Sequence, residues 1–390
     1  MVWRKKIGIF PWHNNVSLNF LESGKPFFDA LLGQIQSAQS SIHFHVYIFA
    51  NDHTGKTIYE ALLAAAKRGV KIILRIDAYG SNNFPIEWEH ALKQRGVDIQ
   101  LFSKFKLAFK YHIGVRLHHK IFVFDEQVAM LGGINISDNY SHWGEEGNWL
   151  DYGISVEGSV VKDLLQICKG IEDGLNLFQP KTTSLEEGKK TVQTDKQIRI
   201  LQNYWFKAKF GISRQYRQKI RNAQHNILLI SSYFLPSPAL KRLLKKAAKR
   251  GVYVELVLGA KSDVKMVQYA TQYFYEDLLK AGVVIREWQA SVLHAKIAFA
   301  DDNWMCIGSY NLNHLSDFGS VECNAEILDP LFISQAKNQI TYSLKNNSHI
   351  VHPASYHQKI QLYHSVRNFL SYQLVSIGMK ILFYLQKSGK

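Results

Sequence analysis

Two short runs of the sequence combine histidine, lysine, aspartate and asparagine at the same spacing. The first reads H-x-K-x4-D-x6-G-G-x-N and the second reads H-x-K-x4-D-x6-G-S-x-N. Their chemically distinctive members are His118, Lys120, Asp125 and Asn135 in the first, and His294, Lys296, Asp301, Ser309 and Asn311 in the second. Corresponding positions are always 176 residues apart, so no insertion separates the two copies internally.

Two histidines suit a reaction that needs both a nucleophile and a general acid. An imidazole with an ordinary pKa near 6.5 can be neutral at one position and protonated at another at the same pH. On a strand, His118 and Lys120 point to the same face, as do His294 and Lys296. The glycine-containing turn that follows can bring each asparagine back towards the same place. We therefore expect one site that draws on both copies.

The two motif aspartates, Asp125 and Asp301, are candidate catalytic residues, but their position after the motif strand favours a structural role in anchoring the turn. A metal site built from His118, His119 and Asp125 is disfavoured because Lys120 would place a cation beside the metal. We therefore expect neither a metal nor a cofactor.

The elements that position these residues are also repeated. The hexapeptide A-A-K-R-G-V occurs at residues 65–70 and 247–252, each time after apolar residues at helical spacing. Gly69 and Gly251 are typical residues for ending a helix. Apolar, β-rich runs flank both helices, at residues 42–49 and 72–76 and at residues 227–234 and 252–258. A duplicated βαβ unit predicts an α/β fold with two sheets and helices on their faces.

A polar stretch at residues 179–200, with Pro180 and Gly188, indicates a linker between the repeats. We predict an N-terminal domain at residues 1–178, the linker at 179–200, a C-terminal domain at 201–352 and an amphipathic tail at 353–390.

The doubled motif resembles the phospholipase D superfamily, whose members attack phosphodiesters through a covalent phosphohistidine without needing a metal. The resemblance covers both halves, at roughly residues 20–345. Within the superfamily the chain is most similar to bacterial cardiolipin synthases, on the run A-L-L-A-A-A-K-R-G-V, Asp77 with Gly80 and Ser81, the run G-G-I-N at residues 132–135, and Tyr233, Phe234 and Pro236. It implies two phospholipase D-like domains, each a mixed β-sheet flanked by helices, packed as a pseudo-twofold pair with the active site at the interface.

The resemblance also implies a role for each site residue. His118 would attack phosphorus and His294 would protonate the leaving alcohol. The groups expected to bind phosphoryl oxygens are those of Lys120, Lys296, Asn135, Ser309 and Asn311. Asp151 and Glu326, which follow the two histidines by 33 and 32 residues, occupy places where the family holds an acidic partner for each histidine. Such a carboxylate would fix the imidazole tautomer and stabilise its charged form.

One position departs from the family pattern. Related synthases commonly place glutamate early in the first half, where this chain has His45 in I-H-F-H-V-Y-I. His43 and His45 share a strand face, but such a pair is more often structural or solvated than metal-binding.

The composition favours an anionic partner. A net charge of +15 and a pI near 9.5 suit either nucleic acid or an acidic membrane surface. Three scattered cysteines without C-x-x-C spacing predict neither disulfides nor a thiolate metal site. The N-terminal apolar run is too short for a signal peptide, and the charge-poor run at 368–386 is too polar for a spanning helix. We expect peripheral attachment to the cytoplasmic side of the cell membrane.

The last segment reads as an amphipathic helix. Its apolar face carries Leu362, Val366, Phe369, Leu370, Leu374, Ile377, Ile381, Tyr384 and Leu385. This pattern favours an in-plane anchor on anionic lipid, and the alternative is a terminal helix packed on the protein core.

The leading functional hypothesis is phosphatidyl transfer, in which one phosphatidylglycerol donates its phosphatidyl group to His118 and a second accepts it to give cardiolipin and glycerol. A hydrolytic phospholipase D that releases phosphatidic acid differs only in using water as the acceptor. A phosphodiesterase acting on nucleic acid also fits the charge, but no aromatic platform interleaved with arginine is evident, so no nucleic-acid partner is expected. A non-catalytic membrane-binding module would require a degraded motif, and both copies are intact. The sequence leaves the oligomeric state open.

Overall fold

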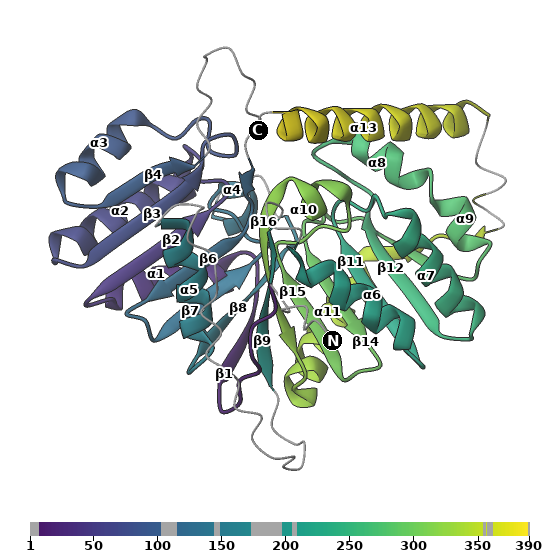
Figure 1. The fold of residues 1–390 in the computed structure, drawn as a ribbon, viewed down its shortest axis with the longest axis horizontal. Helices are drawn as coiled ribbons and strands as arrows, with labels where there is room; N and C mark the ends of the chain where they lie inside the picture. Colours follow the sequence, from purple (N-terminus) through teal and green to yellow (C-terminus); the bar gives the residue numbers. More distant parts are fainter. Residues whose placement is uncertain are drawn as a thin grey trace.

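The structure is a computed structural model that describes residues 8–102, 115–143, 149–172, 197–204, 209–353, 356 and 362–388, without the side chains of residues 204, 209, 362 and 380–388. Two β-sheets stand side by side, each with helices against its faces (Figure 1). The predicted α/β fold with two sheets is therefore confirmed.

The first half builds a seven-stranded sheet. Its strands are β1 (Ser17–Glu22), β2 (Ser41–Val46), β3 (Lys71–Asp77), β4 (Asp98–Phe102), β6 (Lys120–Phe124), β7 (Val128–Gly132) and β8 (Tyr152–Glu157). Its helices are α1 (Lys25–Ser37), α2 (His53–Lys67), α3 (Ile86–Gln94), α4 (Asp138–Ser141) and α5 (Val161–Glu172).

The second half builds a larger sheet. Its strands are β9 (Ile198–Tyr204), β10 (Lys209–Phe210), β11 (Asn226–Ser231), β12 (Tyr253–Gly259), β13 (Val284–Trp288), β14 (Lys296–Ala300), β15 (Trp304–Gly308), β16 (Ser320–Ile327) and β17 (Ser348–Ile350). Its helices are α6 (Gly211–Asn222), α7 (Pro238–Lys249), α8 (Lys265–Gln272), α9 (Tyr275–Leu279), α10 (His314–Phe318), α11 (Pro330–Asn347) and α13 (Leu362–Ser388).

Both sheets repeat one strand order. The first runs β1-β8-β7-β6-β2-β3-β4, and the second contains the matching series β9-β16-β15-β14-β11-β12-β13. In each sheet three strands are parallel, β2 with β3 and β4 and β11 with β12 and β13, and the other pairings of the series are antiparallel. The sheets are thus mixed, as the resemblance implies.

The repeated hexapeptide ends α2 and α7, as predicted. Gly69 and Gly251, just beyond these helices, both have φ of 90°, a left-handed conformation that glycine adopts without steric cost. The turn sends β3 and β12 back parallel to β2 and β11. The strands before the helices end at Val46 and Ser231, three residues earlier than expected, because the chain there leaves the sheet to line the site described below.

The inner faces of the two sheets share one hydrophobic core. Ile121 and Leu131 of the first sheet and Ile297 and Ile307 of the second belong to it and are fully buried. Helices α5 and α11 contribute to the same core, whereas α1 and α2 and, in the other half, α6 and α7 belong to separate outer cores. Because one continuous core joins the halves, the motif strands β6 and β14 are held in a fixed relation.

Segments of the first half also add to the second sheet. Strand β5 (Arg116–Leu117), directly before His118, pairs in parallel with β16, and single bridges join Ile9 to Leu201 and His13 to Ile198 on β9. Of the predicted linker at 179–200, the part up to residue 196 lies outside the described residues, and β9 begins at Ile198.

The C-terminal helix α13 lies along one edge of the molecule, over α8 (Figure 1). Tyr372 stacks on Tyr273 with ring centroids 4.7 Å apart, and the Arg367 guanidinium lies 3.8 Å from the Tyr269 ring. On its other side the helix exposes Val366, Leu370, Leu374 and Ile377, whereas Phe369, also exposed, lies beside Tyr273 with ring centroids 5.9 Å apart. The alternative of packing on the protein is confirmed for one face of the helix. A second apolar face is exposed, and its role as a membrane anchor stays a prediction. Within the part of the chain described, no helix has the length and apolarity needed to cross a membrane.

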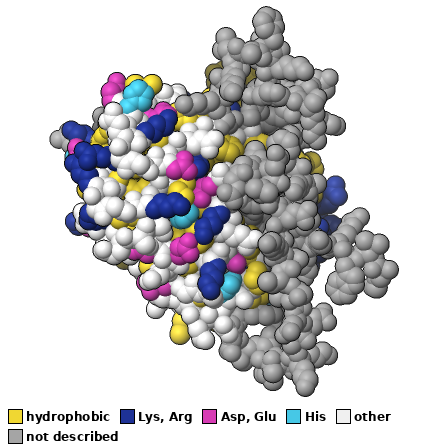
Figure 2. Space-filling model, turned by 60° about the vertical axis from the view of Figure 1, so that its left-hand side comes forward, with side chains coloured by type: hydrophobic (Ala, Val, Ile, Leu, Met, Phe, Trp, Pro, Cys, Tyr) yellow, Lys and Arg dark blue, Asp and Glu magenta, His cyan; other side chains and the backbone are white. Residues whose placement is uncertain are grey.

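The surface of the first half mixes charges of both signs. On the face that Figure 2 brings forward, lysine and arginine side chains lie among acidic and uncharged ones rather than in a single continuous basic area. A nucleic-acid footprint would need basic side chains gathered along one path. The described part of this face shows no such path.

Candidate active site

Both motif histidines lie at the seam between the halves. His118 stands just before β6 and His294 just before β14. The backbone N–H of His118 donates to the carbonyl of Val321 at 3.1 Å, and that of His294 donates to the carbonyl of Leu150 at 2.8 Å. Each histidine is therefore fastened to the backbone of the opposite half.

The imidazole of His118 is oriented by a buried carboxylate. Its Nδ1 lies 2.9 Å from Oε2 of Glu322, and the Ser309 hydroxyl donates to the same oxygen at 2.5 Å. A carboxylate facing Nδ1 favours the tautomer with the proton there, which leaves the lone pair of Nε2 available. Burial lowers the pKa of His118, and the charge of Glu322 opposes that shift. At neutral pH this arrangement suits a nucleophile.

The imidazole of His294 has the same kind of partner. Its Nδ1 lies 2.6 Å from Oδ2 of Asp151 and 3.3 Å from the Tyr140 hydroxyl. Burial lowers the pKa of His294 well below its ordinary value, and the charges of Lys296 and Lys120 lower it further. Burial raises the pKa of Asp151 to about 6, against the opposing effect of Lys296. Without an anion nearby, the pair therefore favours an ionised carboxylate and a neutral ring.

The two motif lysines are buried beside their histidines. Nζ of Lys120 donates to the carbonyl of His118 at 2.7 Å, and Nζ of Lys296 donates to the carbonyl of His294. Burial, with the repulsion of Lys296, lowers the pKa of Lys120 to about 7, and burial lowers that of Lys296 to about 8. A negative charge placed between them would restore both protonated forms. The site is thus built to receive an anion.

The two asparagines belong to the surroundings of the histidines. Oδ1 of Asn135 accepts from the backbone just after β2 at 3.1 Å, and its Nδ2 donates to the Tyr140 hydroxyl at 3.0 Å. Oδ1 of Asn311 accepts from the Ser232 hydroxyl at 2.7 Å. These contacts connect the asparagines to the residues around the histidines, and direct phosphate binding by either amide stays a prediction.

Aromatic side chains that sequence reasoning did not assign to the site surround both rings. The Tyr47 ring centroid lies 5.0 Å from that of His118, and those of Trp149 and Tyr233 lie 5.7 and 6.1 Å from that of His294. The Tyr233 hydroxyl donates to Asp263 at 2.7 Å. Tyr47 follows the last residue of β2, and Tyr233 lies two residues after the end of β11. Both strands are hydrogen-bonded to the motif strands, so this placement was the signal from which the sequence could have assigned the two tyrosines to the site.

The motif aspartates lie away from the reaction centre. Asp125 follows β6, at the opposite end from His118, and accepts from three backbone N–H groups of residues 39–41 at 2.7–2.9 Å. Asp301 repeats this with the N–H groups of residues 224–226. A candidate catalytic role for Asp125 and Asp301 is therefore corrected to a structural one, since their oxygens join the motif turn to the start of β2 and β11.

The acidic partners are crossed between the halves, which corrects two assignments. Asp151, placed after the first motif, pairs with His294 of the second half instead of His118. Glu326 contacts neither histidine, because Arg199 Nε donates to its Oε2 at 2.6 Å and Trp304 Nε1 donates to its Oε1 at 2.7 Å. The prediction that Glu326 partners a motif histidine is wrong, since it stands one residue before the far end of β16.

Glu322 is the partner that sequence reasoning missed. Strand register makes Glu322 equivalent to Asp151. The Gly133 N–H donates at 3.2 Å to the carbonyl of the residue that follows Asp151. In the second half, the Ser309 N–H donates at 3.1 Å to the carbonyl of the residue that follows Glu322. The acidic partner could have been identified as the residue that lies across the strand pair from the motif G-G or G-S. Distance along the chain from the histidine was the less reliable guide.

The second residue of the G-G or G-S pair suits the acidic side chain that it contacts, which is Asp151 for Gly133 and Glu322 for Ser309. A Cβ on Gly133 would lie 2.5 Å from both carboxylate oxygens of Asp151, so this position requires glycine. In the other half Ser309 donates its only hydroxyl proton to Glu322. That proton orients the carboxylate of Glu322, and the predicted contact of Ser309 with phosphate stays a prediction.

Next to His118, a buried network of polar contacts connects His119 to two histidines of β2 and to Glu172. Oε1 of Glu172 accepts from Nδ1 of His43 at 2.7 Å and from Nε2 of His45 at 3.1 Å, and Nδ1 of His45 lies 3.2 Å from Nε2 of His119. If His45 is neutral, its proton faces Glu172, so His119 donates to it and keeps a bare Nδ1. That Nδ1 is buried without a hydrogen-bond partner among the described residues. The two strand histidines thus share a carboxylate, and no group of three or more metal-binding side chains is found in the described ranges.

Comparison with known proteins identifies the relatives of this chain. Residues 31–162 and 216–344 match the family described as cardiolipin synthase, PLD-like domain. Cardiolipin synthase B of Shigella flexneri is 31% identical over 328 residues, which cover 82% of this chain and 78% of that protein. The minor cardiolipin synthase ClsB of Bacillus subtilis is 28% identical over 339 residues, covering 85% and 82%.

A solved structure shares the whole fold. The phosphatidylserine synthase of Haemophilus influenzae Rd KW20 superposes with a TM-score of 0.69 at 18% identity, covering 96% of this chain and 97% of that one. At that identity the likeness concerns the fold alone. Both matched segments of the family contain one motif copy, so the repeat read from the sequence corresponds to two domains of one family.

Proposed function

The chain belongs to the cardiolipin synthase family of phospholipase D-like proteins and is a phosphatidyltransferase, and we propose that it joins two phosphatidylglycerol molecules into cardiolipin and glycerol through a phosphohistidine at His118. The observation that carries the residue roles is the crossed pairing at the seam. Each motif histidine faces a buried carboxylate of the other half, at 2.9 Å for His118 and 2.6 Å for His294. Two buried lysines stand beside them.

In the first step, Nε2 of His118 attacks the phosphorus of one phosphatidylglycerol, and the bond between phosphorus and the headgroup glycerol oxygen breaks. Glu322 accepts from Nδ1–H and stabilises the positive ring that forms. His294 gives a proton to the departing oxygen, so glycerol leaves as a neutral alcohol. Lys120 and Lys296 stabilise the negative charge that grows on the phosphoryl oxygens.

In the second step, a headgroup hydroxyl of another phosphatidylglycerol gives its proton to His294 while its oxygen attacks phosphorus. The phosphorus–nitrogen bond to His118 breaks, which releases cardiolipin and restores the ring. The charges of Lys296 and Lys120 help to lower the pKa of His294. A bound anionic phosphodiester opposes these charges and so raises the pKa of His294. Substrate binding and proton donation are thereby linked.

Purified protein incubated with phosphatidylglycerol vesicles tests this proposal. Mass analysis should find cardiolipin and glycerol in equal amounts, and protein quenched with denaturant at mildly alkaline pH, where the phosphorus–nitrogen bond survives, should carry a phosphatidyl adduct on His118. The variants His118→Asn and His294→Asn should each lose activity by about a thousandfold or more. Phosphatidic acid without cardiolipin would instead identify a hydrolase, and cleavage of a single-stranded DNA control would favour a nuclease.

We also propose that the protein attaches to the anionic, cytoplasmic surface of the membrane through α13. The outward side chains Leu370, Leu374 and Ile377 are each half or more exposed on this helix, although they are large and apolar. Such a surface is stabilised when it enters the interface between headgroups and acyl chains. The net charge of +15 favours anionic lipid for the same reason that it favours the substrate.

A further inference from the structure

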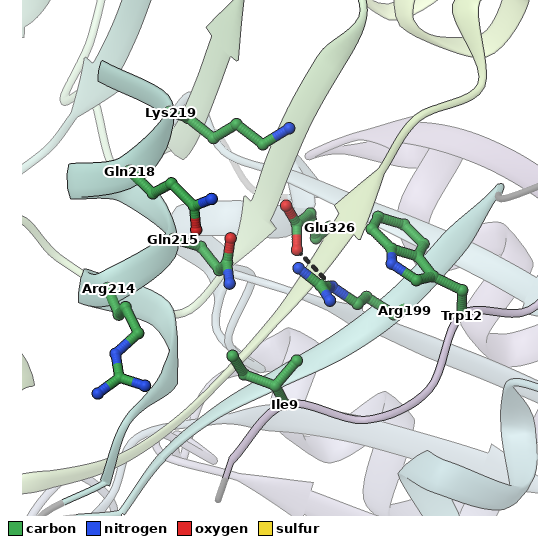
Figure 3. A pocket seen from close by; sticks show the side chains of 8 residues that line it. All are labelled: Ile9, Trp12, Arg199, Arg214, Gln215, Gln218, Lys219 and Glu326. Carbon is green, nitrogen blue, oxygen red and sulfur yellow. Dashed lines mark hydrogen bonds and ion pairs between the residues drawn. The ribbon is translucent and has the colours of Figure 1, made fainter. Parts of the chain in front are cut away.

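A polar cavity of about 260 Å³ has neither motif histidine in its lining (Figure 3). Its lining joins four elements of the chain. Arg199 comes from β9, Glu326 from β16 and Trp12 from the N-terminal segment, while one face of α6 supplies Arg214, Gln215 and Lys219. Nothing in the proposed transfer reaction uses these residues.

The cavity is separate from the reaction centre. Glu322, which faces His118, and Glu326, which lines the cavity, are four residues apart on β16. At a rise of about 3.3 Å per residue, the two positions are about 13 Å apart along the strand. A ligand in the cavity therefore does not share contacts with a phosphodiester at the histidines.

Arg199 is held in one orientation at the base of the cavity. The Trp12 ring lies 4.4 Å from its guanidinium carbon, and its Nε donates to Glu326 at 2.6 Å. The other oxygen of Glu326 accepts from Trp304. Both carboxylate oxygens are thus occupied, whereas Nη1 and Nη2 of Arg199 make no hydrogen bond to a residue that the structure describes. Within the described residues, this fork of donors therefore has no acceptor, and its geometry suits a phosphate or carboxylate ligand.

The α6 side of the cavity adds further donors. Gln215 is 7% exposed, and its amide makes no hydrogen bond within the described ranges. Arg214 precedes Lys219 on α6 by about one and a half turns, and Nζ of Lys219 lies 5.7 Å from the Trp304 ring. Burial lowers the pKa of Lys219, a shift that a bound anion would reverse. With Glu326 already paired, three cations and one carboxylate leave a formal surplus of two positive charges.

We propose that this cavity binds a phosphate monoester of a small polyol. A dianionic phosphate matches the surplus of two charges, and its tetrahedral oxygens can meet donors that approach from β9 and α6 together. The remaining volume accommodates a glycerol-sized group, whose hydroxyls the Gln215 amide can bind. The same chemistry belongs to a soluble ester and to the headgroup of an anionic lipid, so both sources are to be tested.

Calorimetric titration with sn-glycerol 3-phosphate tests the site directly, and short-chain phosphatidic acid below its micelle concentration tests the lipid source. The double variant Arg214→Gln with Lys219→Gln should bind the ester about tenfold or more weakly than wild type. Arg221→Gln removes one positive charge from an exposed position of α6 that does not line the cavity, and it should bind like wild type. Circular dichroism checks that each variant is folded.

The reaction centre also attracts phosphate, so the variant Lys120→Gln with Lys296→Gln separates the two sites. Ester binding that persists in this variant and weakens in the α6 variant supports the proposal. Binding that disappears with the two buried lysines and is unchanged by the α6 substitutions overturns it, as does the absence of binding to wild type from either source. Since the readout is binding and not cardiolipin formation, this result is independent of the proposed function.

Discussion

Replacing Glu322 with glutamine should slow phosphatidyl transfer by about 10- to 150-fold without unfolding the protein. Glutamine keeps the shape of the side chain and removes the negative charge that faces Nδ1 of His118 at 2.9 Å. A hydrogen bond to an ionised partner is worth about 1.5–3 kcal/mol. Each 1.4 kcal/mol or so of lost transition-state stabilisation corresponds to about a tenfold fall in rate.

The surroundings of Glu322 keep the effect within that range. The Ser309 hydroxyl donates to Oε2, whereas Oε1 has no partner among the described residues. The amide oxygen of the variant can therefore take the place of Oε2 and still accept from both Ser309 and His118. The imidazole then keeps its tautomer, and the variant loses the charge alone.

The measurement is initial-rate cardiolipin formation from phosphatidylglycerol vesicles at neutral pH. Glu326→Gln is the matched control, because it makes the same change at a buried position of the same strand. It should lower the melting temperature through the lost pair with Arg199, yet leave kcat within about threefold of wild type. An E322Q enzyme as fast as wild type, or an E326Q enzyme as slow as E322Q, would refute the assignment of the acidic partner.

Three further predictions concern the membrane, the motif turn and pH. Leu370→Glu with Leu374→Glu should reduce sedimentation with anionic vesicles at least about tenfold, because two charges enter the apolar face of α13. The control Leu331→Glu places one charge at an exposed apolar position of α11 and should leave sedimentation unchanged, so equal loss in both would exclude α13 as the anchor. Asp125→Asn should lower the free energy of unfolding, measured in urea, by about 1–2 kcal/mol and keep most activity, because the side chain accepts from backbone N–H groups. A large fall in kcat in folded protein would contradict this structural role. Burial and Lys296 lower the pKa of Lys120 to about 7, so its positive charge is present below that pH and lost above it. The KM for phosphatidylglycerol should therefore rise from pH 7 to 9, and a KM that does not change with pH would contradict this.

The fold was predictable because its signals are local and repeated. The A-A-K-R-G-V hexapeptide fixes the end of a helix and the turn into a parallel strand, and both copies behave alike in the structure. The motif histidines and lysines were equally accessible from their repeated spacing, although each histidine lies just before the strand that begins at its lysine. Conversely, β5 could not be foreseen, because a two-residue strand that joins the other half's sheet leaves no periodic pattern.

The acidic partners were mispredicted for a different physical reason. Asp151 follows Asn135 by 16 residues, but Glu322 follows Asn311 by only 11, so the connecting segments differ in length and the constant spacing of the motif ends there. Both Glu322 and Glu326 lie on the same face of β16, so alternation could not choose between them. Only the register of β16 against β15 determines which of the two glutamates faces His118, and that register is set by strand pairing in the folded protein.

The crossed carboxylates imply that catalysis in this protein is indivisible. Either half made alone would carry a histidine and a lysine but would lack the acid that orients its ring, so no partial enzyme of half the activity is available. Separately produced halves could regain turnover only by docking, with a rate that rises with the product of their concentrations. A single ancestral repeat would have faced the same constraint and would have needed a second copy of itself to work at all.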